Sequence, residues 1–248
     1  MNTGIVWGKT GLHLLRVFNH CVVFAFKLPV LLAACACLSV TSAAAATLQA
    51  QMLDAAGKPL ANAVLTLRGT AGAAHSVSTD VMDQVDRQFV PNVLVVRTGE
   101  AVKFPNSDNI RHHVYSFSPA KRFELRLYQG TPSEPVVFDT PGVVVLGCNI
   151  HDWMVGYVYI TDDPWFAVSD AQGKISLENL PEGRYEATLW HPQNAKMLPV
   201  AGGELDLGAK GLSQIFNFDV AASTAVAPEA PVSSFGDAFN KAKRNAAQ

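Results

Sequence analysis

The sequence predicts an all-β protein made of two β-sandwiches, and three observations carry that prediction. After residue 46, apolar and polar residues alternate with a period of two in many short runs, which is the pattern of half-buried strands. These runs are rich in β-branched and aromatic residues, and Gly, Pro, Asn and Asp separate them at roughly regular spacing. Almost no segment shows the 3.6-residue period of an amphipathic helix. Many short strands of this kind are typical of sandwiches.

Residues 1–46 have the layout of a secretory signal peptide. They hold three basic residues and no acidic one, and an apolar run after Lys27 is followed by the small residues "TSAAAA". The apolar run is shorter than the roughly 20 residues of a membrane span, so we do not expect a membrane-spanning protein. We expect cleavage near Ala45 or Ala46 and export to the periplasm. The alternative is a lipoprotein anchored at Cys35, because "LAAC" resembles a lipobox.

The charge balance after residue 46 is weakly acidic. Three of the 19 basic residues lie in the leader and all 21 acidic residues follow it, which leaves 16 basic against 21 acidic residues. A net charge of −5 argues against nucleic acid and anionic membranes as partners.

Cysteine usage singles out Cys148. The other three cysteines of the chain lie in the leader, so the exported protein cannot form an internal disulfide through it. A lone thiol in an oxidising compartment is either buried as a small apolar residue or held as a ligand or nucleophile.

The predicted strands follow one another with turns between them. Residues 47–54 and 62–69 alternate on either side of the turn "AAGKPL", and residues 70–84 are expected to be a connector. The next strands are expected in 93–106 with a turn at Thr98–Gly99, and then at 112–117, 123–128, 135–139, 142–148 and 155–162.

The last part of the chain continues the pattern. Residues 165–192 supply three strands around turns at Asp170–Gly173 and Pro181–Gly183, and residues 213–220 supply the last strand. Residues 221–248 are rich in Ala, Pro and Ser with few large apolar residues, so a disordered tail is expected there.

The stretch "GCNIHDWMVGYV" carries a thiol, an imidazole and a thioether at regular spacing, in Cys148, His151 and Met154. A second imidazole lies upstream in "DNIRHHVYSF", at His112 or His113. A thiolate with two imidazoles and a distant thioether is the donor set of an electron-transferring copper ion. Zinc also suits Cys and His, but methionine favours copper. Each residue alone would more often be a packing residue; together they predict a copper site.

These residues resemble the cupredoxins, and amicyanin-like proteins most closely. The family's loop is Cys-x-x-His-x-x-Met followed by x-Gly-x-Val, and this chain has the same spacing from Cys148 to Val158. "GEAVKFPNSD" is similar to the family's preceding strand. The resemblance covers roughly residues 81–162 and implies a Greek-key sandwich with one type 1 copper ion. It implies a ligand set of His112, Cys148, His151 and Met154.

The chain departs from the family pattern around the site. His113 stands where the family usually has Asn, so the choice between His112 and His113 stays open. Asp152 and Trp153 replace a common Pro-aromatic pair. A carboxylate beside the site would favour Cu(II), so Asp152→Asn is expected to raise the reduction potential. The alternative is that Asp152 points into water and has little effect.

The flanking segments resemble a different family. Residues 47–67 and 168–192 are similar to a carboxypeptidase regulatory-like domain, a small transthyretin-like sandwich. We expect residues 47–69 and 163–220 to form one such sandwich, interrupted by a cupredoxin unit at 81–162; the alternative is two sequential domains. The whole layout also resembles exported proteins labelled "methylamine utilization protein".

These features predict a single-electron carrier of the bacterial envelope that docks transiently with a redox protein. An enzyme is not expected, since four protein ligands leave the metal no substrate position. One alternative is a copper-binding or delivery module without redox turnover. Another is a structural or carbohydrate-binding envelope protein, with Trp165 and Trp190 as the candidate glycan platform.

Overall fold

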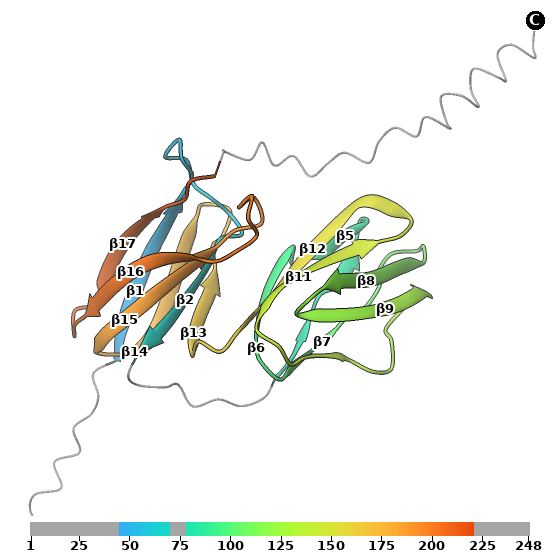
Figure 1. The fold of residues 1–248 in the computed structure, drawn as a ribbon, viewed down its shortest axis with the longest axis horizontal. Coiled ribbons are helices and arrows are strands. Elements are labelled where there is room, and N and C mark those ends of the chain that lie inside the picture. The colour runs from blue at the N-terminus through green and yellow to red at the C-terminus, as the bar shows by residue number, and fades with distance from the viewer. Residues whose placement is uncertain (1–44, 70–77, 221–248) are drawn as a thin grey trace, which may run out of the picture. The chain divides into compact units, whose positions relative to one another are not determined.

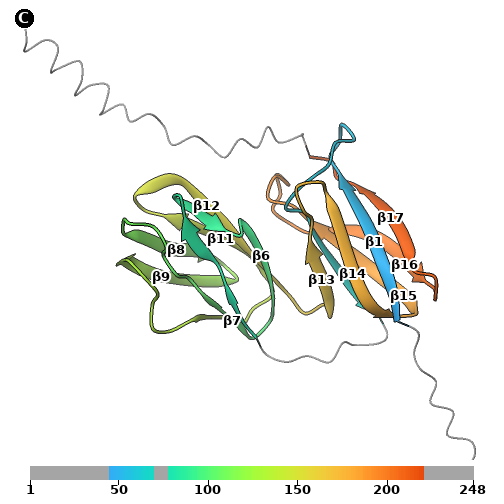
Figure 2. The ribbon, with the colours of Figure 1, turned by 180° about the vertical axis from the view of Figure 1, so that it is seen from behind.

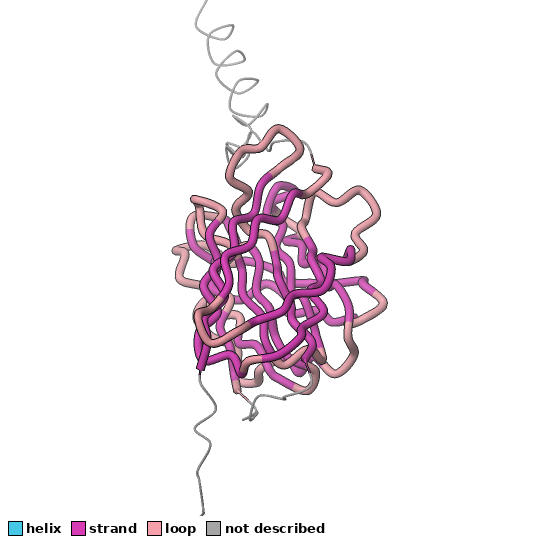
Figure 3. Tube along the Cα trace, turned by 90° about the vertical axis from the view of Figure 1, so that its left-hand side faces the viewer, coloured by secondary structure: helices cyan, strands magenta, loops and turns pink. Residues whose placement is uncertain are grey.

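The computed structural model describes residues 45–69 and 78–220, and every regular element within them is a β-strand (Figure 3). The predicted all-β fold class is therefore confirmed. The expected leader up to residue 44, with Cys35, and the expected tail from residue 221 lie outside the described residues. None of the described residues forms a helix that is long and apolar enough to cross a membrane.

The strands are short, and most of them coincide with predicted runs, but those at 79–81, 83–85, 88–90 and 200–207 were not predicted. In chain order they are β1 (Ala45–Leu53), β2 (Val64–Gly69), β3 (Thr79–Val81), β4 (Asp83–Val85), β5 (Gln88–Val90), β6 (Val93–Arg97), β7 (Glu100–Lys103), β8 (His112–Ser118), β9 (Lys121–Tyr128), β10 (Val136–Phe138), β11 (Gly142–Cys148), β12 (His151–Thr161), β13 (Trp165–Val168), β14 (Lys174–Pro181), β15 (Gly183–Trp190), β16 (Val200–Leu207) and β17 (Leu212–Asn217).

Strands from both ends of the described chain make up the first pair of sheets. One sheet has the order β14-β1-β17 and the other has the order β13-β2-β15-β16 (Figures 1 and 2). In β1 the residues Leu48, Ala50 and Met52 are buried while their neighbours are more exposed, as the alternation predicts. These residues enter a core with apolar side chains of β2, β14, β15, β16 and β17.

Two turns of this pair of sheets are built in the same way. One carboxylate oxygen of Asp54 accepts the backbone N–H of Ala56 and of Lys58, each at 2.8 Å. One carboxylate oxygen of Asp170 accepts the backbone N–H two and four residues later, at 2.9 and 2.8 Å. Both turns end on a glycine with positive φ, Gly57 at 75° and Gly173 at 71°. The same Asp-x-x-Gly turn therefore occurs in both segments that flank residues 81–162.

The remaining strands form a five-stranded sheet, β6-β12-β11-β8-β9, a three-stranded sheet, β10-β7-β3, and the hairpin β4-β5. Their apolar side chains form a second core, which includes Cys148 and Met154. Residues 79–81, expected to belong to a connector, instead form β3, because they pair in parallel with Ala101–Lys103 of β7.

A third buried cluster contains Val64, Val93, Val95, Tyr159 and Trp190. The indole of Trp190 is fully buried, and its ring centroid lies 5.6 Å from that of Tyr159. Trp190 is therefore a packing residue and not part of an exposed glycan platform.

Candidate metal centre

The candidate donors come from three neighbouring strands of one sheet. Cys148 ends β11, His151 begins β12, and His112 begins β8. The strand order β12-β11-β8 makes Cys148 the central position. Two backbone ladders therefore fix the spacing of the three side chains.

The segment from Cys148 to Met154 is more regular than the sequence predicts. His151 was expected in a loop, but it pairs with Cys148 and closes a tight hairpin through Asn149 and Ile150. Since Gly147 pairs with Val155, the register shifts at Cys148, and residues 152–154 form a bulge outside the ladder. The bulge re-aims the side chains between the two pairs, and it leaves Met154 buried at 1% exposure.

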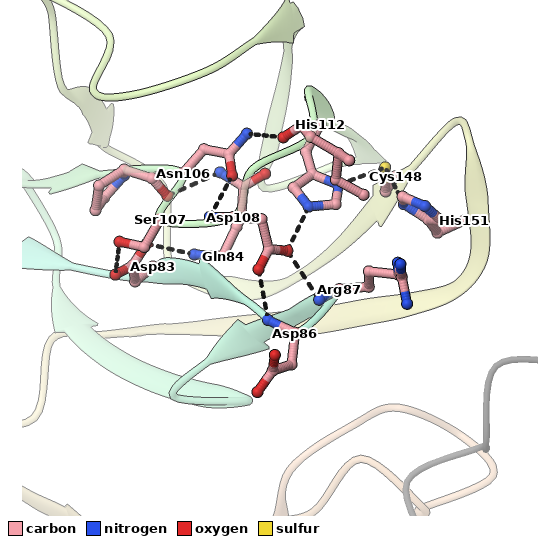
Figure 4. A network of polar contacts seen from close by, with 12 residues as sticks. Asp83, Gln84, Asp86, Arg87, Asn106, Ser107, Asp108, His112, Cys148 and His151 are labelled. Atoms are coloured by element: carbon pink, nitrogen blue, oxygen red, sulfur yellow. Dashed lines mark hydrogen bonds and ion pairs between the residues drawn. The ribbon is translucent and has the colours of Figure 1, made fainter.

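The side chains of His112, Cys148 and His151 converge on one point (Figure 4). The Sγ atom of Cys148 lies 3.9 Å from Nδ1 of His112 and 3.8 Å from Nδ1 of His151. One donor atom from each residue lies within 4.8 Å of the others. His112 and Cys148 are buried, and His151 is half-buried.

This geometry fits a single metal ion. With metal–nitrogen bonds of about 2.0 Å and metal–sulfur bonds of about 2.3 Å, donors in a trigonal arrangement lie roughly 3.7 Å apart. The two sulfur–nitrogen distances are within about 0.2 Å of that value. A thiolate with two imidazoles suits copper or zinc, and the buried thioether of Met154 in the same core cluster suits copper.

His113 lies elsewhere. Its Nε2 atom is 3.0 Å from the carboxylate of Glu124 on β9, and its ring centroid lies 5.5 Å from that of Tyr115. The register of β8 against β9 shifts between His112 and Val114, and it is His112 whose ring nitrogen lies 3.9 Å from Sγ of Cys148. The structure brings His112, and not His113, to Cys148.

The ring of His112 is held from its other side by Asp108, which the sequence analysis did not single out. Nε2 of His112 lies 2.7 Å from a carboxylate oxygen of Asp108. That carboxylate also accepts the backbone N–H of Asp86 at 2.8 Å and of Arg87 at 2.9 Å. The signal that was available is the spacing of Asp108 four residues before His112, which alone is not specific.

Two further features shape this part of the site. Asp86 and Arg87 form the turn of the β4-β5 hairpin with φ of 52° and 59°, and this conformation aims both N–H groups at Asp108. The amide of Asn106 donates to the carbonyls of Ile110 and Tyr128, each at 2.9 Å, and accepts the N–H of Asp108. Asn106 therefore holds the loop between β7 and β8.

The charges of the site shift two pKa values. Partial burial opposes ionisation of Asp108, but hydrogen bonds from Arg87, His112 and Asp86 outweigh it and lower the pKa of Asp108. Burial, together with the charges of His112 and Arg87, lowers the pKa of His151. A neutral His151 imidazole is the form that binds a metal.

A surface hollow of about 470 Å³ opens beside Cys148. Tyr115 and Phe117 line it, with ring centroids 5.3 Å apart, together with Val145 and Asp152. The side chain of Asp152 is exposed. The structure therefore places Asp152 at the surface, in agreement with the alternative in which it points into water.

A scan against protein-family models gives no match, and a search of curated proteins gives none either. Among solved structures, the chain is similar to a purple cupredoxin from Nitrosopumilus maritimus, with 21% identity over 34% of this chain and 99% of that chain, at a TM-score of 0.30. It is similar to an oxidised mutant of amicyanin, with 16% identity over 40% of this chain and 99% of that chain, also at 0.30.

A third similar structure is the copper-containing nitrite reductase from Thermus scotoductus, with 22% identity over 38% of this chain and a TM-score of 0.33. The chain spans only 25% of that reductase. Each of these likenesses is limited to two-fifths of this chain or less, so the donor set itself is what bears on function.

Proposed function

We propose that this protein is a type 1 copper protein that carries single electrons in the bacterial envelope. One observation carries the proposal: the buried Sγ of Cys148 lies between Nδ1 of His112 and Nδ1 of His151, at separations that one ion can span. When bound, copper supplies a one-electron couple between Cu(I) and Cu(II).

The chain's own residues have separate roles in this proposal. Cys148 would supply a thiolate to the ion, and His112 and His151 would each supply an imidazole. Met154, in the bulge of β12, would supply a thioether. Because His112, Cys148 and His151 sit on neighbouring strands of one sheet, the sheet would restrict their movement when the charge of a bound ion changes. Little reorganisation is the property that fast electron transfer requires.

The exposed side of the site supports docking with a redox protein. His151 is only half-buried, and the ring of Trp153 packs against it at a tilt of 56° with centroids 5.2 Å apart. Ile150, between Cys148 and His151, is 49% exposed. A small apolar patch around a half-exposed ligand fits the small interfaces of transient redox complexes. Neither nucleic acid nor a membrane is expected as a partner of an acidic chain.

We also propose that the copper unit is inserted into a transthyretin-like sandwich. The strand pairings support this arrangement: β1 pairs with β14 and β17, and β2 pairs with β13 and β15. The strands β3 to β12 pair only among themselves within the described residues. Export to the periplasm remains a proposal from the leader sequence.

The deciding experiment is the absorption spectrum of the protein, expressed as the full chain and purified from the periplasm, after addition of Cu(II). We expect an intense thiolate-to-copper band in the visible range that is lost in Cys148→Ala and His112→Ala. His113→Ala is the matched control and should keep the band, since His113 pairs with Glu124. A colourless wild-type protein without stoichiometric copper would refute the proposal.

A delivery module without redox turnover would have the same donor set. Electron self-exchange separates the two functions. Exchange measured by line broadening in mixtures of reduced and oxidised protein should be fast for a carrier. Slow exchange in a protein that binds copper would favour delivery.

A further inference from the structure

The carboxylate of Asp108 occupies a defined place behind the proposed copper site (Figure 4). It lies in the loop between β7 and β8, and its side chain is only 13% exposed. One oxygen accepts the N–H of Asp86, and the other accepts the N–H of Arg87 and contacts Nε2 of His112. Two backbone donors therefore hold this carboxylate in position before any metal binds.

We propose that Asp108 is a positioning residue: it keeps His112 in the form with the proton on Nε2, directs Nδ1 to the copper ion, and stabilises the oxidised ion. This inference rests on the proposed function, since it concerns the same site.

The first part follows from hydrogen-bond chemistry. An ionised carboxylate only accepts hydrogen bonds, so the 2.7 Å contact requires a proton on Nε2 of His112. A neutral imidazole with a proton on Nε2 has its lone pair on Nδ1. Nδ1 is the atom that lies 3.9 Å from Sγ of Cys148. The ring is fully buried, and its two nitrogens face Asp108 and Cys148.

The second part follows from charge. A carboxylate that accepts a hydrogen bond from a ligating imidazole makes that imidazole more basic, and it adds negative charge near the ion. Both effects favour the ion of higher charge. Because Asp108 is mostly shielded from solvent, salt and water screen this charge much less than they screen a surface carboxylate.

Asp152 provides a matched control. It is the neighbour of His151 in sequence and carries the same charge, but its side chain is exposed at the rim of the hollow beside Cys148. Removing its charge tests a nearby carboxylate that is not hydrogen-bonded to a ligand.

The substitution Asp108→Asn is close to isosteric and still breaks the arrangement. Each carboxylate oxygen of Asp108 faces at least one N–H group. Whichever of the two oxygens is replaced by the amide NH2 of Asn, that NH2 group faces the N–H of Asp86 or of Arg87, and two hydrogen-bond donors then oppose each other. The smaller Asp108→Ser removes the contact to His112 without an opposed donor, so it separates loss of the acceptor from local repulsion.

The first readout needs no copper. Nitrogen-15 NMR of the metal-free protein in mildly alkaline buffer reports which nitrogen of His112 carries the proton. We expect only the Nε2–H form in wild type and in Asp152→Asn, and a mixture of both forms in Asp108→Ser. An unchanged Nε2–H form in Asp108→Ser would overturn the positioning role.

The second readout is the affinity for each copper ion together with the reduction potential. Removal of a hydrogen-bond partner of a ligand typically costs 10- to 100-fold in metal affinity. We expect Asp108→Asn and Asp108→Ser to weaken Cu(II) binding about tenfold more than Cu(I) binding, which corresponds to a potential raised by about 59 mV. Asp152→Asn should leave the potential nearly unchanged.

Equal potentials in wild type and both Asp108 variants would overturn the electronic role. A wild-type protein that binds no copper would refute the proposed function, and the NMR result on the metal-free protein would still decide whether Asp108 orients His112.

Discussion

Gly156 is a position where one added methyl group should disturb the core around the proposed copper site. It lies in β12 opposite Leu146 of β11. A Cβ atom at Gly156 would lie 2.7 Å from Cβ of Phe89 and 2.9 Å from Cγ and Cδ2 of its ring. Phe89 is on β5, is 1% exposed, and belongs to the same core cluster as Cys148.

The cost of Gly156→Ala follows from these distances. Contacts below 3.0 Å cannot be tolerated, and the buried ring of Phe89 has no free space into which to move. The β5 backbone must shift because Cβ of Phe89 is itself in the way. Overpacking of this kind costs about 1–3 kcal/mol, which is roughly a 5- to 140-fold change in the unfolding equilibrium. The same shift moves the β4-β5 hairpin, whose turn holds Asp108.

The assay is urea unfolding of the metal-free protein, followed by tryptophan fluorescence. Gly208→Ala is the control, because a Cβ there meets nothing within 4 Å. We expect the control to change stability by no more than about 0.5 kcal/mol. If Gly156→Ala were as stable as Gly208→Ala, the packing of Phe89 on β12 would not be as tight as described.

Three further predictions concern other residues. Burial lowers the pKa of His191 below its ordinary 6.5 despite the hydrogen bond to Ala61, so the unfolded chain binds the proton more readily than the folded protein does. The stability of the folded protein should therefore fall as the pH drops below about 6.5. The urea midpoint should fall less over the same pH range in His191→Gln. Asp163 accepts hydrogen bonds from Thr66 at 2.5 Å and from Arg68 at 2.9 Å. Asp163→Ala leaves the buried Thr66 hydroxyl unpaired, so it should lower the free energy of unfolding by about 1–3 kcal/mol in the same urea assay. A loss of stability below about 0.5 kcal/mol would contradict this role. Free copper at 100 times its Kd should stabilise the wild-type protein by about 2.7 kcal/mol, seen as a higher melting temperature, and should not stabilise Cys148→Ala; equal shifts in the two proteins would place the copper elsewhere.

Local pattern was sufficient to predict most strands and the donor cluster. Alternation in residues 47–54 marks a strand because side chains of a strand alternate between core and surface, and the apolar run of β-branched residues at 142–148 marks another. The spacing from Cys148 to Met154 marked three candidate donors because Cys148, His151 and Met154 all lie in one short hairpin. Alternation and short spacings can be recognised in a single sequence because they depend only on residues that are close together along the chain.

What the sequence could not predict depends on distant segments. Asp108 matters because the β4-β5 turn, more than 20 residues earlier, aims two N–H groups at it. Asp152 was predicted to affect the reduction potential only because it adjoins His151 in sequence, and the structure places it at the surface. The choice between His112 and His113 needed the direction of each side chain in β8. The strands β3, β4 and β5 were missed because each is only three residues long. The strand β16 was missed because Gly202 and Gly203 interrupt its pattern.

The pairing of β2 with β13 has a consequence for how this protein assembles. Leu67 faces Trp165, so this antiparallel pair is closed by nearly a hundred residues in place of a short turn. Closing a flexible loop of that length costs about 3 kcal/mol more than closing one of four residues. The strands β3 to β12 lie within this loop, and once they are ordered they shorten the flexible span that must still be closed. The sheets β14-β1-β17 and β13-β2-β15-β16 should therefore form after β3 to β12. A metal ion that stabilises the enclosed strands would then also favour completion of a sandwich that it never touches.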